Sequence, residues 1–241
     1  MSIEAIVLAG GLGTRLRAAV ADVPKPMAPV GGRPFLEWLL AYWIAQGIER
    51  FVLSVGYRAE RIADHFGSVW RGARVACAVE TEPLGTGGGL LHALENVHGE
   101  DLLVLNGDTF FAVRLEAFLS AHRAAAADCS LALFRSTNTG RYLGVRLGED
   151  GEVLSLDSTP SGETALVNGG VYLFRRAALN DVPWPRGRRM SLETELLPGA
   201  LRDGWHMIGR ESEGPFVDIG LPEDYARAAA VISAGPLAPD Q

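Results

Sequence analysis

The chain has 241 residues, of which 48% are hydrophobic, and its formal net charge is -7. A chain of this length and composition can bury a substantial core, and an α/β protein of this size can be one domain. The negative charge argues against a protein that holds nucleic acid or anionic lipid on a broad basic face. We therefore expect no nucleic-acid partner and no membrane partner, and any phosphate should bind at a local site.

The first residues lack the basic start and long apolar run of a signal peptide, and no apolar run approaches the roughly 18 to 20 residues of a membrane-spanning helix. The two cysteines, Cys77 and Cys129, lack the spacing of a metal site or a disulfide framework. Both are expected to be buried, reduced thiols, which indicates a cytoplasmic protein. Residues 235–241 contain two prolines and predict a flexible tail.

The first half of the chain alternates between short apolar runs and segments with helical spacing of apolar residues. We expect strands at 5–8, 51–55, 74–79, 102–105 and 130–134, and helices at 35–46, 59–66, 86–97 and 115–127. Uninterrupted apolar strands separated by helices are typical of a mostly parallel sheet with helices on both faces. The helix at 35–46 contains two tryptophans and is expected to belong to the core.

The second half of the chain has a different pattern. Asp150 and Gly151 lie between two strand-like runs, at 142–147 and 152–156, and this dipeptide is a strong hairpin signal. Further strands are expected at 171–174 and 216–219, with helices at 192–202 and 223–233. The sequence therefore predicts an α/β fold with a mixed sheet and a small antiparallel portion.

A glycine-rich segment follows the first expected strand, and residues 8–17 read LAGGLGTRLR. Gly10, Gly11 and Gly13 allow backbone amides to approach an anion closely, and Arg15 adds a guanidinium suited to phosphate oxygens. A dinucleotide fingerprint would need glycine at Leu16, and the Gly-Lys-Ser/Thr of a P-loop is absent from the sequence. A plain glycine-rich turn is the alternative interpretation.

Downstream, Lys25 stands between Pro24 and Pro26, which stiffen the chain around it. Together, GGLGTRL at residues 10–16 and PKPM at residues 24–27 resemble the signature of the sugar-phosphate nucleotidyltransferase family. The resemblance continues through EPLGTGG, NGDT, NGGVY and DIGLPEDY, which begin at residues 82, 106, 168 and 218. It implies a Rossmann-like core in a single domain at 1–234, with a nucleotide-binding part at about 1–135 and a sugar-binding part at about 136–215.

The resemblance implies that a nucleoside triphosphate reacts with a sugar 1-phosphate, releasing pyrophosphate and forming a nucleotide sugar. Asp108 and Asp218 each follow an apolar strand, where a ligand crevice is expected in an α/β sheet, although either could be a turn former or helix cap. By resemblance both bind Mg²⁺, which prefers oxygen ligands. The implied catalytic residues are Arg15 on the leaving pyrophosphate, Lys25 between the α-phosphate and the sugar phosphate, and Asp108.

The resemblance also implies two sets of substrate contacts. The nucleotide-binding set comprises Leu8, Ala9, Gly10, Gly11, Gly13, Thr14, Glu80, Pro83, Gly85 and Thr86. The sugar-binding set comprises Thr109, Tyr142, Gly144, Asn168, Gly169 and Glu193. Glu80 is the residue expected to face the nucleobase. Its carboxylate only accepts hydrogen bonds, which suits the N1–H and N2–H₂ donors of guanine and favours GTP, unless Glu80 is simply a surface residue.

Within the family, the motifs look most like D-glycero-α-D-manno-heptose 1-phosphate guanylyltransferases, which make GDP-heptose for surface polysaccharides. Many relatives carry Glu-Lys-Pro after the hairpin, with the lysine on the sugar phosphate, whereas this chain reads DSTP at residues 157–160. Arg141 or Arg146 could replace that charge, or Lys25 could act alone. Two rival functions remain: a uridylyl- or thymidylyltransferase for a hexose or amino-sugar 1-phosphate, and a non-catalytic nucleotide-binding regulatory subunit. The oligomeric state stays open, a homo-oligomer included.

Overall fold

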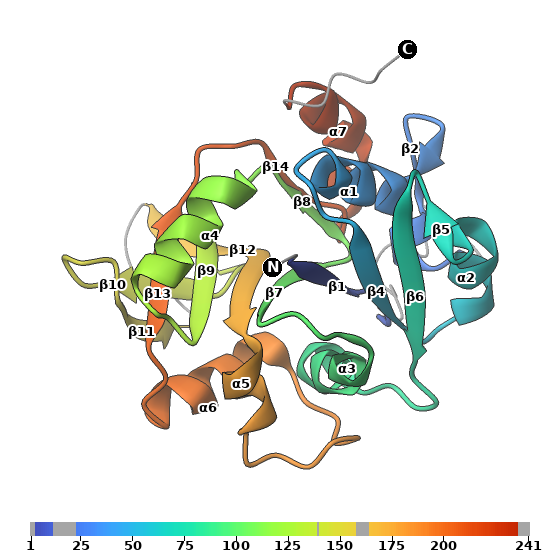
Figure 1. Cartoon of the computed structure of the whole chain (residues 1–241). Helices are drawn as coiled ribbons and strands as arrows, with labels where there is room; N and C mark the ends of the chain where they lie inside the picture. The colour runs from blue at the N-terminus through green and yellow to red at the C-terminus, as the bar shows by residue number, and fades with distance from the viewer. Residues whose placement is uncertain (1–2, 12–22, 139, 158–163, 236–241) are drawn as a thin grey trace.

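The computed structural model describes residues 3–11, 23–138, 140–157 and 164–235. Four parallel strands form the centre of its main sheet. They lie side by side in the order β7 (Asp101–Asn106), β1 (Glu4–Leu8), β4 (Arg50–Val55) and β6 (Ala73–Val79) (Figure 1). The middle residues of β7, β1 and β4 are buried apolar side chains, because helices cover both faces of the sheet there. Four of the five strands expected in the first half of the chain are confirmed here.

Antiparallel strands extend this sheet. The long strand β12 (Ala165–Arg175) pairs with β7 on one side and with β9 (Cys129–Ser136) on the other, and β9 pairs in parallel with β13 (Met207–Glu211). The hairpin of β10 (Gly144–Leu147) and β11 (Val153–Asp157) continues the sheet from β12. The predicted hairpin and mixed sheet are confirmed, and with β5 (Val69–Trp70) the main sheet has ten strands.

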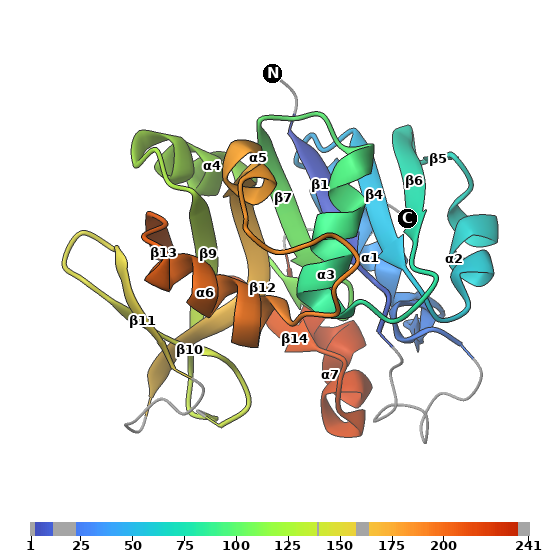
Figure 2. The ribbon, with the colours of Figure 1, turned by 90° about the horizontal axis from the view of Figure 1, so that it is seen from below.

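Two layers of helices enclose the sheet (Figures 1 and 2). One face is covered by α1 (Phe35–Ile44), α2 (Ala59–Phe66), α4 (Leu115–Ala124) and α7 (Pro222–Ser233), and the other by α3 (Gly85–Ala93), α5 (Arg176–Asn180) and α6 (Leu197–Arg202). Successive side chains of a strand point to opposite faces, so Ala5 and Val7 join one core while Ile6 joins the other. Helix α1 is core, as its two buried tryptophans predicted.

Several elements differ from the sequence predictions. The expected helix at 192–202 begins as a π-helix, η3 (Leu192–Leu196), before α6, and the expected helix at 86–97 ends in a 3₁₀ turn, η2 (Leu94–Asn96). The sequence did not predict α5, β13, the turn η1 (Lys25–Met27), or the short strands β2 (Pro29–Val30), β3 (Arg33–Pro34), β5 and β8 (Thr109–Phe111). Two- and three-residue strands are too short to show a period. Cys129 is buried as expected, whereas Cys77 is only half-buried.

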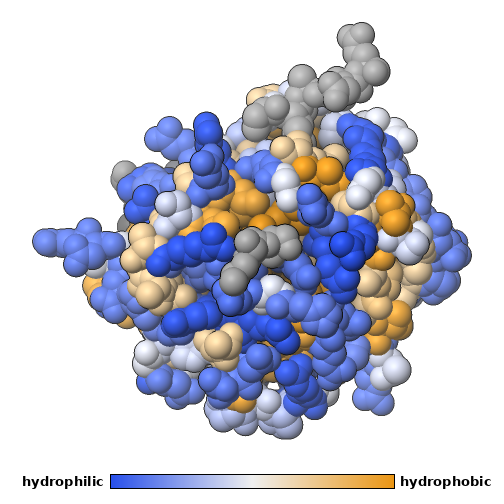
Figure 3. All heavy atoms as spheres, viewed as in Figure 1, coloured by the Kyte–Doolittle hydropathy of each residue, from blue (hydrophilic) through white to orange (hydrophobic). Residues whose placement is uncertain are grey.

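Hydrophilic residues dominate the face shown in Figure 3, with hydrophobic residues in smaller groups between them. The exposed large hydrophobic residues of the described chain are Val69, Val79 and Leu154, which lie on β5, β6 and β11 near the two ends of the sheet. None of the helices in the described part of the chain is both long enough and apolar enough to span a bilayer.

Candidate active site

The carboxyl ends of β1, β4, β6 and β7 open onto a cavity of about 360 Å³. Ligands of open α/β sheets bind at this edge, because loops and helix starts leave a crevice there. All described members of the predicted nucleotide-binding set line the cavity, namely Leu8, Ala9, Gly10, Gly11, Glu80, Pro83, Gly85 and Thr86. Gly13, Thr14 and the predicted catalytic residue Arg15 lie outside the described residues.

Glu80 follows β6, and its carboxylate is held in one orientation inside this cavity. Ser54 Oγ donates a hydrogen bond to Glu80 Oε1, and the Leu84 backbone N–H donates one to Oε2, each at 2.9 Å. A carboxylate oxygen can accept two hydrogen bonds, so both oxygens keep a free acceptor position for a ligand. Glu80 is therefore an oriented acceptor in the pocket and not an isolated surface charge.

Glycines let the chain pack against this carboxylate without displacing it. A Cβ atom on Gly10 would lie 2.4 Å from Glu80 Oε1, and one on Gly89 would lie 2.8 Å from the same oxygen. At the start of α3, Gly85 has φ +72°, and its Cβ would lie 2.6 Å from the Met190 carbonyl oxygen. Some glycines of the GTGGG run thus allow the segment around Met190 to approach α3.

A second cavity, of about 470 Å³, adjoins the first. The two share Asn106, Asp108 and Glu193. Five members of the predicted sugar-binding set line the second cavity, namely Thr109, Tyr142, Asn168, Gly169 and Glu193. Gly144 does not line it: this glycine begins β10 and pairs with Val167 of β12. The structure therefore brings together all of the predicted sugar contacts except Gly144.

A hydrogen-bond network fixes the wall between the two cavities. Glu193, in the π-helix η3, accepts hydrogen bonds from Thr86 Oγ1 at 2.9 Å and from Asn106 Nδ2 at 3.3 Å. Tyr172 donates its hydroxyl to Glu193 at 3.4 Å and accepts a bond of 2.6 Å from Asn168 Nδ2. Asn106 Oδ1 is buried and has no hydrogen-bond partner among the described residues.

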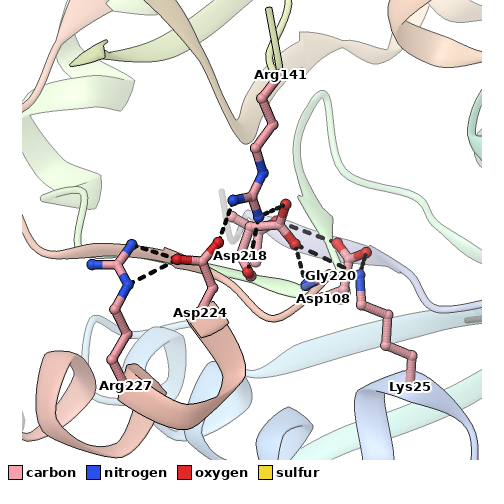
Figure 4. Close-up of polar contacts among 8 residues, drawn as sticks. Lys25, Asp108, Arg141, Asp218, Gly220, Asp224 and Arg227 are labelled. Atoms are coloured by element: carbon pink, nitrogen blue, oxygen red, sulfur yellow. Dashed lines mark hydrogen bonds and ion pairs between the residues drawn. The ribbon is translucent and has the colours of Figure 1, made fainter. Parts of the chain in front are cut away.

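Two strands that are absent from the main sheet place the paired carboxylates. Strand β8 pairs antiparallel with β14 (Phe216–Asp218), with Thr109 opposite Asp218, so Asp108 and Asp218 become neighbours. The Lys25 ammonium is hydrogen-bonded to Asp108 Oδ2 and lies 3.6 Å from Asp218 Oδ1 (Figure 4). Lys25 is held in the turn η1, in which Pro26 is buried, and its side chain is only 11% exposed.

This pair of carboxylates fits a divalent cation. Both contact the same ammonium group, so their oxygens converge on one point, and Mg²⁺ commonly takes one or two carboxylates together with substrate phosphates. Among the described residues there is no group of three or more His, Cys, Asp or Glu side chains suited to a metal. A metal ion held by Asp108 and Asp218 would take its remaining oxygens from water or from a bound phosphate.

Arg141 lies on the other side of Asp218. Its Nη2 donates to Asp218 Oδ2 at 2.8 Å, and its Nη1 donates to Asp224. Burial acts to lower the pKa of Arg141, but the hydrogen bonds with Asp224 and Asp218 outweigh it and raise the pKa. Burial likewise acts to raise the pKa of Asp224, but Arg141 and Arg227 lower it. Arg141 lines the second cavity, whereas Arg146 is exposed on β10.

Comparisons with known proteins show which family this chain belongs to. Residues 4–234 match the family model described as Nucleotidyl transferase. The chain belongs to this family. It is 36% identical over 226 residues to D-glycero-alpha-D-manno-heptose 1-phosphate guanylyltransferases of Aneurinibacillus thermoaerophilus and Campylobacter jejuni, covering 94% and 92% of this chain and 96% and 97% of those proteins.

A crystal structure of HddC from Yersinia pseudotuberculosis complexed with GMP-PN has a TM-score of 0.82 and 30% identity, covering 95% of this chain and 98% of that one. The predicted family and α/β fold are thus confirmed, and the chain is a sugar-1-phosphate nucleotidyltransferase. Members of this family typically use a divalent metal ion.

Several residues of the site were missed from the sequence, among them Arg189, Asn106 and Asp224. Arg189 lines the first cavity and has no hydrogen bond or ion pair with another described residue; the basic run RGRR at residues 186–189 was its only local signal. Asn106 belongs to the NGDT motif, but its position between the cavities follows from β7 ending there. Asp224 reads as an ordinary acidic residue in the first turn of a helix, and its ion pair with Arg141 has no local signal.

The packing of Gly10 against Glu80 gives a testable prediction. Gly10→Ala should push the flexible carboxylate aside without disrupting the fold, so the melting temperature should stay within a few degrees of the wild type. Loss of one hydrogen bond from a charged group should raise the KM for the nucleotide about tenfold. In a Glu80→Ala background, Gly10→Ala should add little. Equal losses in both backgrounds would show that Gly10 acts independently of Glu80.

Proposed function

We propose that this enzyme transfers GMP from GTP to a sugar 1-phosphate, D-glycero-α-D-manno-heptose 1-phosphate, releasing pyrophosphate and forming GDP-heptose. The observation that carries the proposal is the oriented Glu80 carboxylate at the nucleotide end of the first cavity. Its free acceptor positions suit the adjacent N1–H and N2–H₂ donors of guanine, whereas uracil and thymine offer only N3–H. The two guanylyltransferase relatives support the same base.

The phosphates would lie between the glycine-rich segment and Lys25. The sugar phosphate oxygen attacks the α-phosphorus of GTP, one P–O bond forms, and the bond to pyrophosphate breaks. No general base is needed, because that oxygen is ionised at neutral pH. Lys25 would contact the α-phosphate and the sugar phosphate, and Arg15 and Arg189 would contact the other phosphates. Positioning and charge neutralisation then supply the catalysis.

The metal site would be formed by Asp108 and Asp218, with Mg²⁺ as the expected ion. A bound divalent cation neutralises the charge that develops on the phosphates. Asp108 lies where the two cavities meet, and Asp218 lines the second cavity. Both carboxylates therefore face the position expected for the reacting phosphates. This arrangement gives Asp108 and Asp218 a role that a nucleotide-binding regulatory subunit would not require.

The sugar would occupy the second cavity. Its lining offers hydroxyl, amide and carboxylate groups from Thr109, Asn168 and Glu193, which are suited to a polyhydroxylated ring. The heptose assignment is supported by the two heptose 1-phosphate guanylyltransferase relatives. It is tested by pyrophosphate release with GTP and a panel of heptose, mannose and glucose 1-phosphates. The heptose 1-phosphate should give the highest kcat/KM. A clear preference for a hexose 1-phosphate would show that the heptose assignment is wrong.

The catalytic assignments predict a large loss of turnover without loss of the fold. Lys25→Ala and Asp108→Asn should each lower kcat by on the order of 10² to 10³, because each removes a preorganised electrostatic contact. Pyrophosphate release measures the rate, and circular dichroism checks that each variant is folded. Wild-type turnover in either folded variant would contradict the assignments.

The guanine assignment is tested with purine analogues. The wild type should prefer GTP to ITP about tenfold, because inosine lacks the 2-amino group and loses one hydrogen bond to a charged acceptor. Glu80→Gln should narrow the ratio of kcat/KM for GTP and ITP. A wild-type preference for UTP or dTTP over GTP would exclude the guanine assignment while leaving the nucleotidyltransferase chemistry intact.

A further inference from the structure

Side chains of alternating charge run from α7 to the turn that holds Lys25 (Figure 4). Arg227 contacts Asp224, Asp224 contacts Arg141, Arg141 contacts Asp218, and Lys25 contacts both Asp218 and Asp108. Three carboxylates thus meet three cations, so the cluster is formally neutral. Arg141, Asp224 and Arg227 form the half of this cluster beyond Asp218, and they have no role in the proposed reaction.

The two oxygens of Asp218 have different partners. Oδ1 accepts the Gly220 backbone N–H at 2.7 Å and faces Lys25 at 3.6 Å. Oδ2 accepts Arg141 Nη2 at 2.8 Å, and the same nitrogen lies 3.3 Å from the Asp218 backbone oxygen. A carboxylate held at both oxygens cannot rotate freely. Arg141 therefore directs Oδ1 of Asp218 toward Lys25 and Asp108.

Arg141 is itself anchored by a buried group. Asp224 lies in the first turn of α7 and is 6% exposed. It accepts Arg141 through Oδ2 and accepts Arg227 Nε and Nη2 through Oδ1, each at 2.8 Å. The planar guanidinium can hold two carboxylates at fixed angles, which the ammonium of a lysine cannot do.

We propose that Arg141, anchored by Asp224, is a positioning residue that presents Oδ1 of Asp218 to the divalent cation. The inference rests on the metal site of the proposed function. Arg141 also lines the sugar-side cavity, next to Tyr142, whose ring packs against Phe134 and Phe216. The same residue therefore links the segment that borders the sugar cavity to a metal-binding carboxylate.

Positioning and simple electrostatics predict opposite effects when the charge of Arg141 is removed. A cation close to a metal site repels the metal, so loss of that charge alone would strengthen metal binding. Loss of an outer partner that orients a ligand weakens metal binding, typically 10- to 100-fold. The sign of the change in metal affinity therefore distinguishes the two roles.

The test uses the full chain and Mn²⁺ alone, with free Mn²⁺ measured by electron paramagnetic resonance. Arg141→Gln should weaken Mn²⁺ binding about tenfold. Arg141→Lys should also weaken Mn²⁺ binding, because the charge is kept but the planar guanidinium that holds two carboxylates is lost. Arg227→Gln is the matched control, because it removes the same charge from the far side of Asp224 and leaves the contacts of Asp218 in place. The Mn²⁺ affinity of this variant should equal or exceed that of the wild type.

Two other variants separate the possible failures. Asp108→Asn should abolish the same Mn²⁺ binding; if the wild type binds no more Mn²⁺ than this variant, the proposed metal site itself is wrong. If Asp108→Asn loses binding but both folded Arg141 variants bind as tightly as the wild type, the positioning role alone is overturned. Melting curves establish that each variant is folded. If Arg141→Gln does not fold, Arg141→Lys carries the test.

Discussion

The site depends on one ammonium group that two carboxylates share. Asp108 and Asp218 are brought together by the pairing of β8 with β14, and two like charges at this distance would repel each other without a cation. Lys25 supplies that cation from a turn flanked by prolines, so its position is set by the backbone as well as by the ion pairs. Segments far apart in the sequence are thereby fixed at one point.

Around this point the sheet supplies the rest of the geometry. Parallel strands end at a common edge, so Leu8, Ser54, Glu80 and Asn106 meet there although they are distant in sequence. Close approach then depends on residues without side chains: a Cβ atom on Gly10 or Gly89 would meet the Glu80 carboxylate, and one on Gly170 would meet Asn106. The glycines of the site thus act partly by making room for polar side chains, in addition to exposing backbone amides.

The sequence predicted features that leave a local pattern. Strands β1, β4 and β7 are buried on both faces and therefore read as apolar runs, and the Asp150–Gly151 turn marks its hairpin. The glycine and proline motifs pointed to many of the residues that line the two cavities. The sequence did not reveal β8 as a strand, because three residues show no period, nor the π-helix that carries Glu193, because its composition is that of an ordinary helix.

Ion pairs between distant segments were also invisible in the sequence. Arg141 was one of the alternatives for the missing charge on the sugar phosphate, but its ion pairs with Asp218 and Asp224 depend on how α7 packs. The partial exposure of Cys77 was not predicted either, because it depends on the place of β6 near the end of the sheet, where only β5 lies beyond it. What could not be predicted was therefore tertiary placement, whereas the chemical types of the site residues could be read from the motifs.

The ion pairs imply that the two ligands of the proposed function bind cooperatively. Lys25 is occupied by Asp108 and Asp218, so it can serve a phosphate fully only when these carboxylates find another cation. Conversely, the two carboxylates supply only part of the coordination of a metal ion, and phosphate oxygens can take positions that water would otherwise fill. Each ligand thus supplies what the other requires, and linkage makes the effect reciprocal. Lys25 would therefore exchange the two carboxylates for a phosphate when the metal ion binds, which couples triphosphate binding to metal binding. Arg141 would keep Asp218 in place during this exchange.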